Sequence, residues 1–141
     1  MQTLKIFQSL WAMEQRHPFL EEPTDDEKFE KIKSAGFDGM CIDLAAHEVE
    51  HFKKTQPLFE QHKLECMVNA FPYALDDLSP VLQLAKDFDA CFVNIIGGVM
   101  PIDFRDGIPV VEKWMQDGED IGIDVLFETH RDSILNDLYY T

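Results

Sequence analysis

The stretch Gly39-Met40-Cys41-Ile42-Asp43-Leu44 is apolar at almost every position and does not alternate between apolar and polar residues. Four other short runs share this character, at residues 4–11, 64–70, 91–96 and 123–128. Near-continuous apolar runs of this length are typical of parallel strands that are covered on both faces. The sequence therefore predicts five parallel β-strands.

Helical segments separate these runs. A capping box over Thr24-Asp25-Asp26-Glu27 starts the first helix, and Gly36 ends it. A second helix is expected over about 46–62, with a kink or a restart at Pro57. The third helix is expected to begin with Ser79 as cap and Pro80 as first residue. The fourth helix is expected to run from Ile108-Pro109 to about Gly118 and to fray at its end. A fifth helix is expected to start over 132–141.

The alternation of strands and helices predicts an α/β chain with a parallel sheet and right-handed crossovers. Two architectures fit a single domain over residues 1–141. One is a complete five-stranded doubly wound sheet. The other is the front part of an eight-stranded barrel, in which each strand and helix unit takes roughly 31 residues. No glycine-rich phosphate loop follows the first strand, where the sequence reads Trp11-Ala12-Met13-Glu14-Gln15-Arg16-His17, and this weakens the doubly wound alternative.

Charge and cysteine content narrow the class of protein. The chain has 27 acidic and 12 basic side chains, which gives a net charge of -15 and disfavours binding to nucleic acid or to an anionic membrane. Cys41, Cys66 and Cys91 lie at equal intervals, which indicates a repeat, and their odd number inside apolar segments is typical of thiols in a reducing compartment. The first residues show neither a basic region nor a small-residue cleavage site, so we expect no secretory signal, and no apolar run reaches the roughly 20 residues of a membrane helix. We expect a cytoplasmic protein that binds a small polar ligand or a metal.

The ends of the predicted strands carry polar and aromatic residues. Parallel α/β folds place their sites at the carboxyl ends of the strands. The candidates at these ends are Trp11, Asp43, Asn69, Phe71, Asn94, Glu128, His130 and Arg131. An alternative for Asp43, Asn69 and Asn94 is that they cap the next helix or brace a turn. Trp11 and Phe71 form either an apolar wall for a sugar ring or part of the core.

The densest group of candidates is Phe127-Glu128-Thr129-His130-Arg131-Asp132. Because side chains alternate along a strand, Glu128 and His130 are expected on one side and Thr129 on the other. A carboxylate beside an imidazole suits a divalent metal, or a carboxylate base with a hydrogen-bonding partner. The alternative is a surface ion pair between Glu128 and Arg131. His47 and His51 have the spacing of a metal-binding pair, but the pattern around them favours a solvated helix face.

Four segments resemble one known superfamily. Phe7-Gln8-Ser9-Leu10-Trp11-Ala12-Met13, Ala35-Gly36-Phe37-Asp38-Gly39, Phe92-Val93-Asn94 and Phe127-Glu128-Thr129-His130-Arg131 resemble the xylose isomerase-like TIM barrels. This superfamily contains sugar phosphate isomerases and epimerases, and also enzymes of the apurinic endonuclease type. The resemblance implies that the chain is the N-terminal part of such a barrel, with strands one to five and about four helices.

The resemblance also implies roles for the candidates. Glu128 matches a carboxylate that binds a divalent metal (Mn²⁺, Mg²⁺ or Zn²⁺) and moves a proton next to a substrate carbonyl, with His130 beside it as a second catalytic residue. Arg131 would hold either an anionic group of a sugar or sugar phosphate or a carboxylate next to the metal ligands, and Trp11, Asp43, Phe71 and Asn94 would contact this substrate. The family draws its other metal ligands from strands six to eight, so the resemblance implies that the metal site is incomplete in this chain and that the chain alone is inactive.

Two other functions stay open at this point. A phosphodiester hydrolase of the apurinic endonuclease type would use the same barrel, but it would need a basic groove that a charge of -15 does not favour. A non-catalytic half-barrel would instead associate with another chain or with a second copy through the exposed edges of strands one and five.

Overall fold

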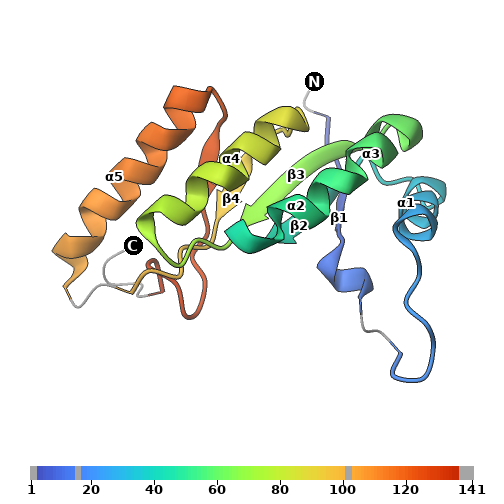
Figure 1. Ribbon diagram of the computed structural model, residues 1–141, viewed down its shortest axis with the longest axis horizontal. Helices are drawn as coiled ribbons and strands as arrows, with labels where there is room; N and C mark the ends of the chain where they lie inside the picture. Colours follow the sequence, from blue (N-terminus) through green and yellow to red (C-terminus); the bar gives the residue numbers. More distant parts are fainter. Residues whose placement is uncertain (1–2, 15–16, 101–102, 137–141) are drawn as a thin grey trace.

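Five parallel strands, arranged in the order of the sequence, form one sheet. The computed structural model describes residues 3–14, 17–100 and 103–136 (Figure 1). The strands are β1 (Phe7–Ser9), β2 (Gly39–Leu44), β3 (Glu65–Ala70), β4 (Val93–Ile95) and β5 (Val125–Phe127). The helices are α1 (Asp25–Ser34), α2 (Val49–Phe52), α3 (Gln56–His62), α4 (Leu78–Asp87) and α5 (Phe104–Ile121). The predicted α/β chain of parallel strand and helix repeats is confirmed.

The strand order tests the doubly wound alternative. A doubly wound sheet reverses its strand order at one point, whereas this sheet runs β1-β2-β3-β4-β5 without a reversal. The doubly wound alternative is therefore wrong. Right-handed crossovers that always move in one direction keep the helices on one face of the sheet. Figure 1 shows the resulting row, with α1 beside β1 at one end and α5 at the other.

The two faces of the sheet differ in composition. On the helix side, Met40, Ile42 and Leu44 of β2 and Val68 of β3 are fully buried, and they pack with helix residues such as Leu82 in one apolar core. The residues between them point to the other face. That face carries Asp43, Asn69 and Asn94, which the strand register places side by side. The helix side thus stabilises the sheet, and the opposite face carries the polar residues.

Four strands are shorter than predicted, β3 by one residue only, whereas β2 has the predicted bounds. The first strand ends at Ser9, and Trp11 begins a 3₁₀ turn, η1 (Trp11–Met13), instead of ending the strand. The predicted strands over 91–96 and 123–128 are reduced to three residues each. Among the described residues, β1 and β5 each pair on one side only, so fewer ladder hydrogen bonds hold them in extended form.

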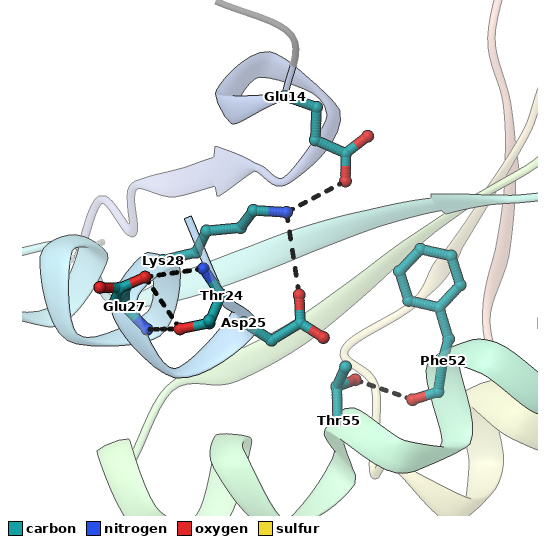
Figure 2. A network of polar contacts seen from close by, with 7 residues as sticks. All are labelled: Glu14, Thr24, Asp25, Glu27, Lys28, Phe52 and Thr55. Atoms are coloured by element: carbon teal, nitrogen blue, oxygen red, sulfur yellow. Dashed lines mark hydrogen bonds and ion pairs between the residues drawn. The ribbon is translucent and has the colours of Figure 1, made fainter. Parts of the chain in front are cut away.

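The predicted capping box opens α1. Thr24 N donates to Glu27 Oε2 (2.8 Å), and Glu27 N donates to Thr24 Oγ1 (3.3 Å). Figure 2 shows this reciprocal pair and, next to it, the buried ammonium of Lys28, which lies 3.4 Å from Glu14 Oε1 and 3.8 Å from Asp25 Oδ1. Gly36 follows the helix with φ of 84°, a left-handed conformation that glycine adopts without strain. The predicted end of α1 is thus confirmed.

The other helices differ in their bounds. The segment predicted as one helix over 46–62 is divided into 3₁₀ turns and the two helices α2 and α3. Pro57 lies in the first turn of α3, so the predicted restart of the helix at this proline is confirmed. The third helix, α4, starts at Leu78, so Ser79 is inside it and Pro80 is its third residue. A proline is tolerated there because the first N–H groups of a helix have no partner within it.

The last helix begins earlier than predicted. Helix α5 starts at Phe104 after the cap Asp103, whose Oδ1 accepts from Arg105 N (2.9 Å), and Pro109 lies inside it. It also continues past Gly118, and Gly122 ends it with φ of 74°. Residues 132–136 form turns instead of the predicted fifth helix, and 137–141 lie outside the described residues. No helix in the described part of the chain is long and apolar enough to cross a membrane.

Candidate functional site

A continuous row of side-chain hydrogen bonds crosses the face of the sheet that lies away from the helices. Ser9 Oγ donates to Asp43 Oδ2 (2.8 Å), and Asn69 Nδ2 donates to Asp43 Oδ1 (2.7 Å). Asn94 Nδ2 donates both to Asn69 Oδ1 (3.0 Å) and to Glu128 Oε2 (2.6 Å). We call these five residues the polar ladder. It takes one residue from each of β1 to β4 and ends just beyond β5.

The strand register explains why the ladder forms. Asp43, Asn69 and Asn94 occupy matched positions on β2, β3 and β4, so their side chains project side by side. Ser9 pairs with Cys41, two residues before Asp43. Glu128 lies two residues after Leu126, which pairs with Asn94. A shift of two residues keeps a side chain on the same face, so the ladder runs obliquely across the strands.

A pocket of about 570 Å³ opens beside the ladder at the carboxyl ends of the strands. Six of the seven residues predicted to be catalytic or substrate-binding line it: Trp11, Asp43, Phe71, Glu128, His130 and Arg131. The seventh, Asn94, is bonded to the Glu128 carboxylate. The strand-end rule therefore selected residues that the fold brings together, although their roles stay predictions.

The segment after β5 is held firmly against the rest of the site. Glu128 N donates to Ile95 O (3.0 Å), and Ile134 N donates to Gly97 O (2.8 Å). Between these points, the buried Ser133 donates its hydroxyl to His130 O (2.6 Å). These bonds tie both ends of the 128–134 segment to β4 and its following residues, so the backbone that carries the candidate residues is fixed.

Glu128 and His130 both line the pocket, as the alternation of strand residues predicts. His130 Nδ1 lies 2.6 Å from Arg131 O. A carbonyl oxygen only accepts, so Nδ1 carries a hydrogen, and in the neutral imidazole Nε2 then has the lone pair. In the described part of the chain, Arg131 makes no ion pair with Glu128, so the alternative of a surface pair between them is wrong.

Aromatic side chains form a second wall. Trp11 is 67% exposed, so its alternative role as a core residue is wrong. Phe71 and Tyr73 lie on the segment after β3, where Asp77 Oδ2 accepts from Tyr73 N (3.0 Å). A methyl group on Gly98 would come within 2.5 Å of the Tyr73 ring, so a glycine is needed there for close packing. These rings present flat apolar surfaces next to carboxylate and imidazole groups.

Asp43, Asn69 and Asn94 do not have the helix-capping role that the sequence left open for them. No helix in the described residues has Asp43, Asn69 or Asn94 as its cap, and these side chains bond to one another instead. Both oxygens of Asp43 accept hydrogen bonds inside the ladder. A substrate would therefore meet Asp43 as part of a bonded network.

Cys41 lies on the same face as the ladder but is 3% exposed. Burial, together with the negative charge of Asp43, raises the pKa of the Cys41 thiol to about 12. This thiol therefore stays protonated at neutral pH and is a poor nucleophile.

The donor set does not fit a complete metal site. Glu128 Oε2 is bonded to Asn94, so Oε1 is the oxygen of this carboxylate that stays open to a ligand among the described residues. No group of three or more His, Cys, Asp or Glu side chains in the described chain could hold a metal ion. A catalytic metal typically needs about three protein ligands. The described residues therefore supply fewer than three ligands to any one metal ion.

Several pocket and ladder residues were not among the predicted site residues. They are Ser9, Ala45, His47, Glu48, Asn69, Tyr73 and Ile96. Ser9 lies inside the predicted first run, two residues before its end, and Asn69 is a strand-end candidate for which a capping role is the alternative. His47 was assigned to a solvated helix face, and it is exposed there while also lining the pocket. Tyr73 carried no signal, because only the path of the loop after β3 brings it to the pocket.

No protein-family model and no curated protein matches this chain.

Proposed function

We propose that the chain forms the first five strand and helix units of a TIM barrel of the xylose isomerase-like kind, and that its pocket binds a sugar or sugar phosphate for isomerisation or epimerisation. The observation that carries the proposal is the gathering of Glu128, His130 and Arg131 with Trp11 and Phe71 around one pocket at the strand ends. Parallel strands in sequential order, with helices on one face, are how such a barrel begins.

In this proposal Glu128 is the carboxylate that moves a proton on the carbon next to a carbonyl. Glu128 lines the pocket, and Asn94 holds one of its two oxygens, Oε2. His130 has an Nε2 lone pair that can accept a hydrogen bond from a substrate hydroxyl. Arg131 offers a guanidinium to a phosphate or carboxylate. Trp11, Phe71 and Tyr73 offer apolar faces to the C–H surface of a sugar ring.

The implied divalent metal, Mn²⁺, Mg²⁺ or Zn²⁺, would take Glu128 as one ligand, and at least one more of its about three protein ligands would have to come from outside the described residues. We therefore propose that this chain alone binds metal weakly and is inactive. Isothermal titration with Mn²⁺ is expected to show no tight site. Tight one-to-one binding that is lost in Glu128→Gln would contradict this.

The balance of charge in the pocket favours a sugar over a nucleic acid. Asp43, Glu48 and Glu128 line it together with a single guanidinium, that of Arg131. Phosphodiester backbones are recognised by several basic groups, so the pocket gives no support to an enzyme of the apurinic endonuclease type.

The test is an NMR titration of the 141-residue chain with a matched pair of probes, D-fructose and D-fructose 6-phosphate. We expect shifts at the Trp11 indole, His130 and Arg131, with tighter binding of the phosphate ester. Arg131→Gln should abolish the difference between the two probes, and Glu128→Gln should weaken both. Glu112→Gln, the same change on the exposed side of α5, is the control. Shifts confined to residues outside the pocket would overturn the proposal.

A half-barrel that associates with a second copy is the other candidate, and the exposed edges favour it. On the β1 side, Leu4 is 82% exposed and Ile6 is also exposed, and on β5 Leu126 is 51% exposed. Unpaired strand edges with apolar side chains tend to pair with other chains. Sedimentation velocity over a range of concentrations tests this: a monomer at every concentration would exclude edge pairing, and Leu126→Lys should dissociate a dimer.

A further inference from the structure

We propose that Asn94 is a positioning residue, which holds the Glu128 carboxylate in one rotamer and leaves Oε1 for a ligand in the pocket. The inference rests on the proposed function in one respect, because it takes Glu128 as the group that meets the ligand. Its structural basis is that Asn94 Nδ2 donates two hydrogen bonds, one to Glu128 Oε2 (2.6 Å) and one to Asn69 Oδ1 (3.0 Å).

A count of hydrogens shows that Asn94 has one workable orientation. A side-chain amide nitrogen carries two hydrogens, and both are used, one toward Asn69 and one toward Glu128. A flipped Asn94 would place its carbonyl oxygen against two acceptor oxygens. Such an arrangement would lose both hydrogen bonds and add repulsion, so the flipped state is disfavoured.

The far end of the ladder fixes this orientation. Asp43 is an acceptor only, and its two oxygens accept from Ser9 and Asn69. The Asn69 amide nitrogen therefore faces Asp43, and its carbonyl oxygen is left to face Asn94. Asp43 thus fixes the orientation of the Asn69 amide, and Asn69 in turn fixes the Asn94 amide, whose nitrogen faces Glu128.

Glu128 is held at both its backbone and its side chain. Its N–H donates to Ile95 O (3.0 Å), while Oε2 accepts from Asn94. A side chain that is already ordered loses less entropy when it engages a ligand. Partners that orient a reactive carboxylate in this way raise affinity without touching the ligand.

The experiment measures the rotamer of Glu128 in the full chain from its three-bond NMR couplings. In the wild type we expect the couplings of a single rotamer, and in Asn94→Ala the averaged couplings of free rotation. Asn136→Ala, the same change at an exposed asparagine outside the ladder, should leave them unchanged. A single Glu128 rotamer in folded Asn94→Ala would overturn the inference, whatever happens to stability.

A second variant covers the case in which Asn94→Ala does not fold. Glu128→Ala alters a half-buried residue outside the core, and it should move the Asn94 side-chain amide protons upfield and speed their exchange with solvent. Unchanged amide protons would also contradict the inference. The fructose titrations separate the inference from the proposed function. If wild-type Glu128 shows the couplings of a single rotamer but no sugar binds, the proposed function alone is overturned. If a sugar binds but wild-type Glu128 shows averaged couplings, the inference alone is overturned.

Discussion

The Asn69 amide nitrogen donates a hydrogen bond to Asp43 Oδ1 across 2.7 Å and joins two neighbouring strands through their side chains. Because Asp43 only accepts, this contact depends on a donor at position 69. The pair is the part of the polar ladder at which a small chemical change has the clearest consequence.

Asn69→Asp should therefore destabilise the fold while keeping the shape of the side chain. It places an acceptor against Asp43 and removes a partially buried hydrogen bond, so we expect a loss of about 1–3 kcal/mol in the free energy of unfolding at pH 7. The loss should shrink toward about pH 4, where carboxyl groups take up protons and become donors. Urea unfolding measures it, with Asn136→Asp as the control, and equal losses in the two variants would contradict the role of the ladder.

Gly98→Ala should disturb the aromatic wall of the pocket. The added methyl group would lie 2.5 Å from Tyr73 Cδ1, and overpacking of this kind costs about 1–3 kcal/mol. Tyr73→Ala removes the clash, so the double variant should be no less stable than Tyr73→Ala alone. Additive losses in this double-mutant cycle would show that Gly98 and Tyr73 do not interact.

Trp114→Phe should lower stability because the indole is fully buried and its Nε1 donates to Leu75 O (3.1 Å). Loss of the donor leaves a carbonyl without this partner, which costs about 1–3 kcal/mol. The same substitution at the exposed Trp11 is the control and should cost less than about 0.5 kcal/mol. Thermal unfolding of the two variants compares them directly.

The three cysteines should differ in reactivity, and Glu65 should control one of them. Burial raises the pKa of the Cys41 and Cys66 thiols, and Cys91 is exposed. Partial burial and its hydrogen bond to Glu65 Oε2 (3.2 Å) raise the pKa of Cys91.

Glu65→Gln removes the negative charge, lowers the pKa of Cys91 and increases its thiolate fraction near pH 8. Alkylation followed by mass spectrometry should therefore show faster modification of Cys91 in the variant and slow modification of Cys41 and Cys66 in both proteins. Equal Cys91 rates would show that Glu65 does not restrain this thiol.

Thr24→Ala removes the cap of α1 and should cost about 1 kcal/mol. Hydrogen bonds from the Thr24 backbone and side chain lower the pKa of Glu27. The stabilisation by Glu27 is therefore present above its ordinary pKa and is lost as the pH falls through its lower value in the folded state. A smaller acid-induced loss of stability in Thr24→Ala than in the wild type, measured by denaturant unfolding from neutral to acidic pH, checks this sign.

Much of the fold could be predicted from local signals, and the errors have a common cause. The bounds of β2, the capping box at Thr24 and the stop at Gly36 rest on local signals in the sequence. The ends of β1, β4 and β5 depend on how far a neighbouring strand extends. The predicted start of the fourth helix at Ile108-Pro109 is wrong because a proline favours the first turn of a helix, whereas Pro109 lies inside α5, which starts at Phe104.

The sequence by itself determined that five apolar runs would form strands and that polar residues would follow near their carboxyl ends, because apolar runs and side-chain alternation are local properties. Only the tertiary structure decided that Ser9, Asp43, Asn69, Asn94 and Glu128 bond to one another, and that Tyr73 joins Trp11 at the pocket. These contacts join residues far apart in the chain, and they depend on strand register and loop path. Register is set by the packing of the whole sheet against its helices, which no single segment of sequence contains.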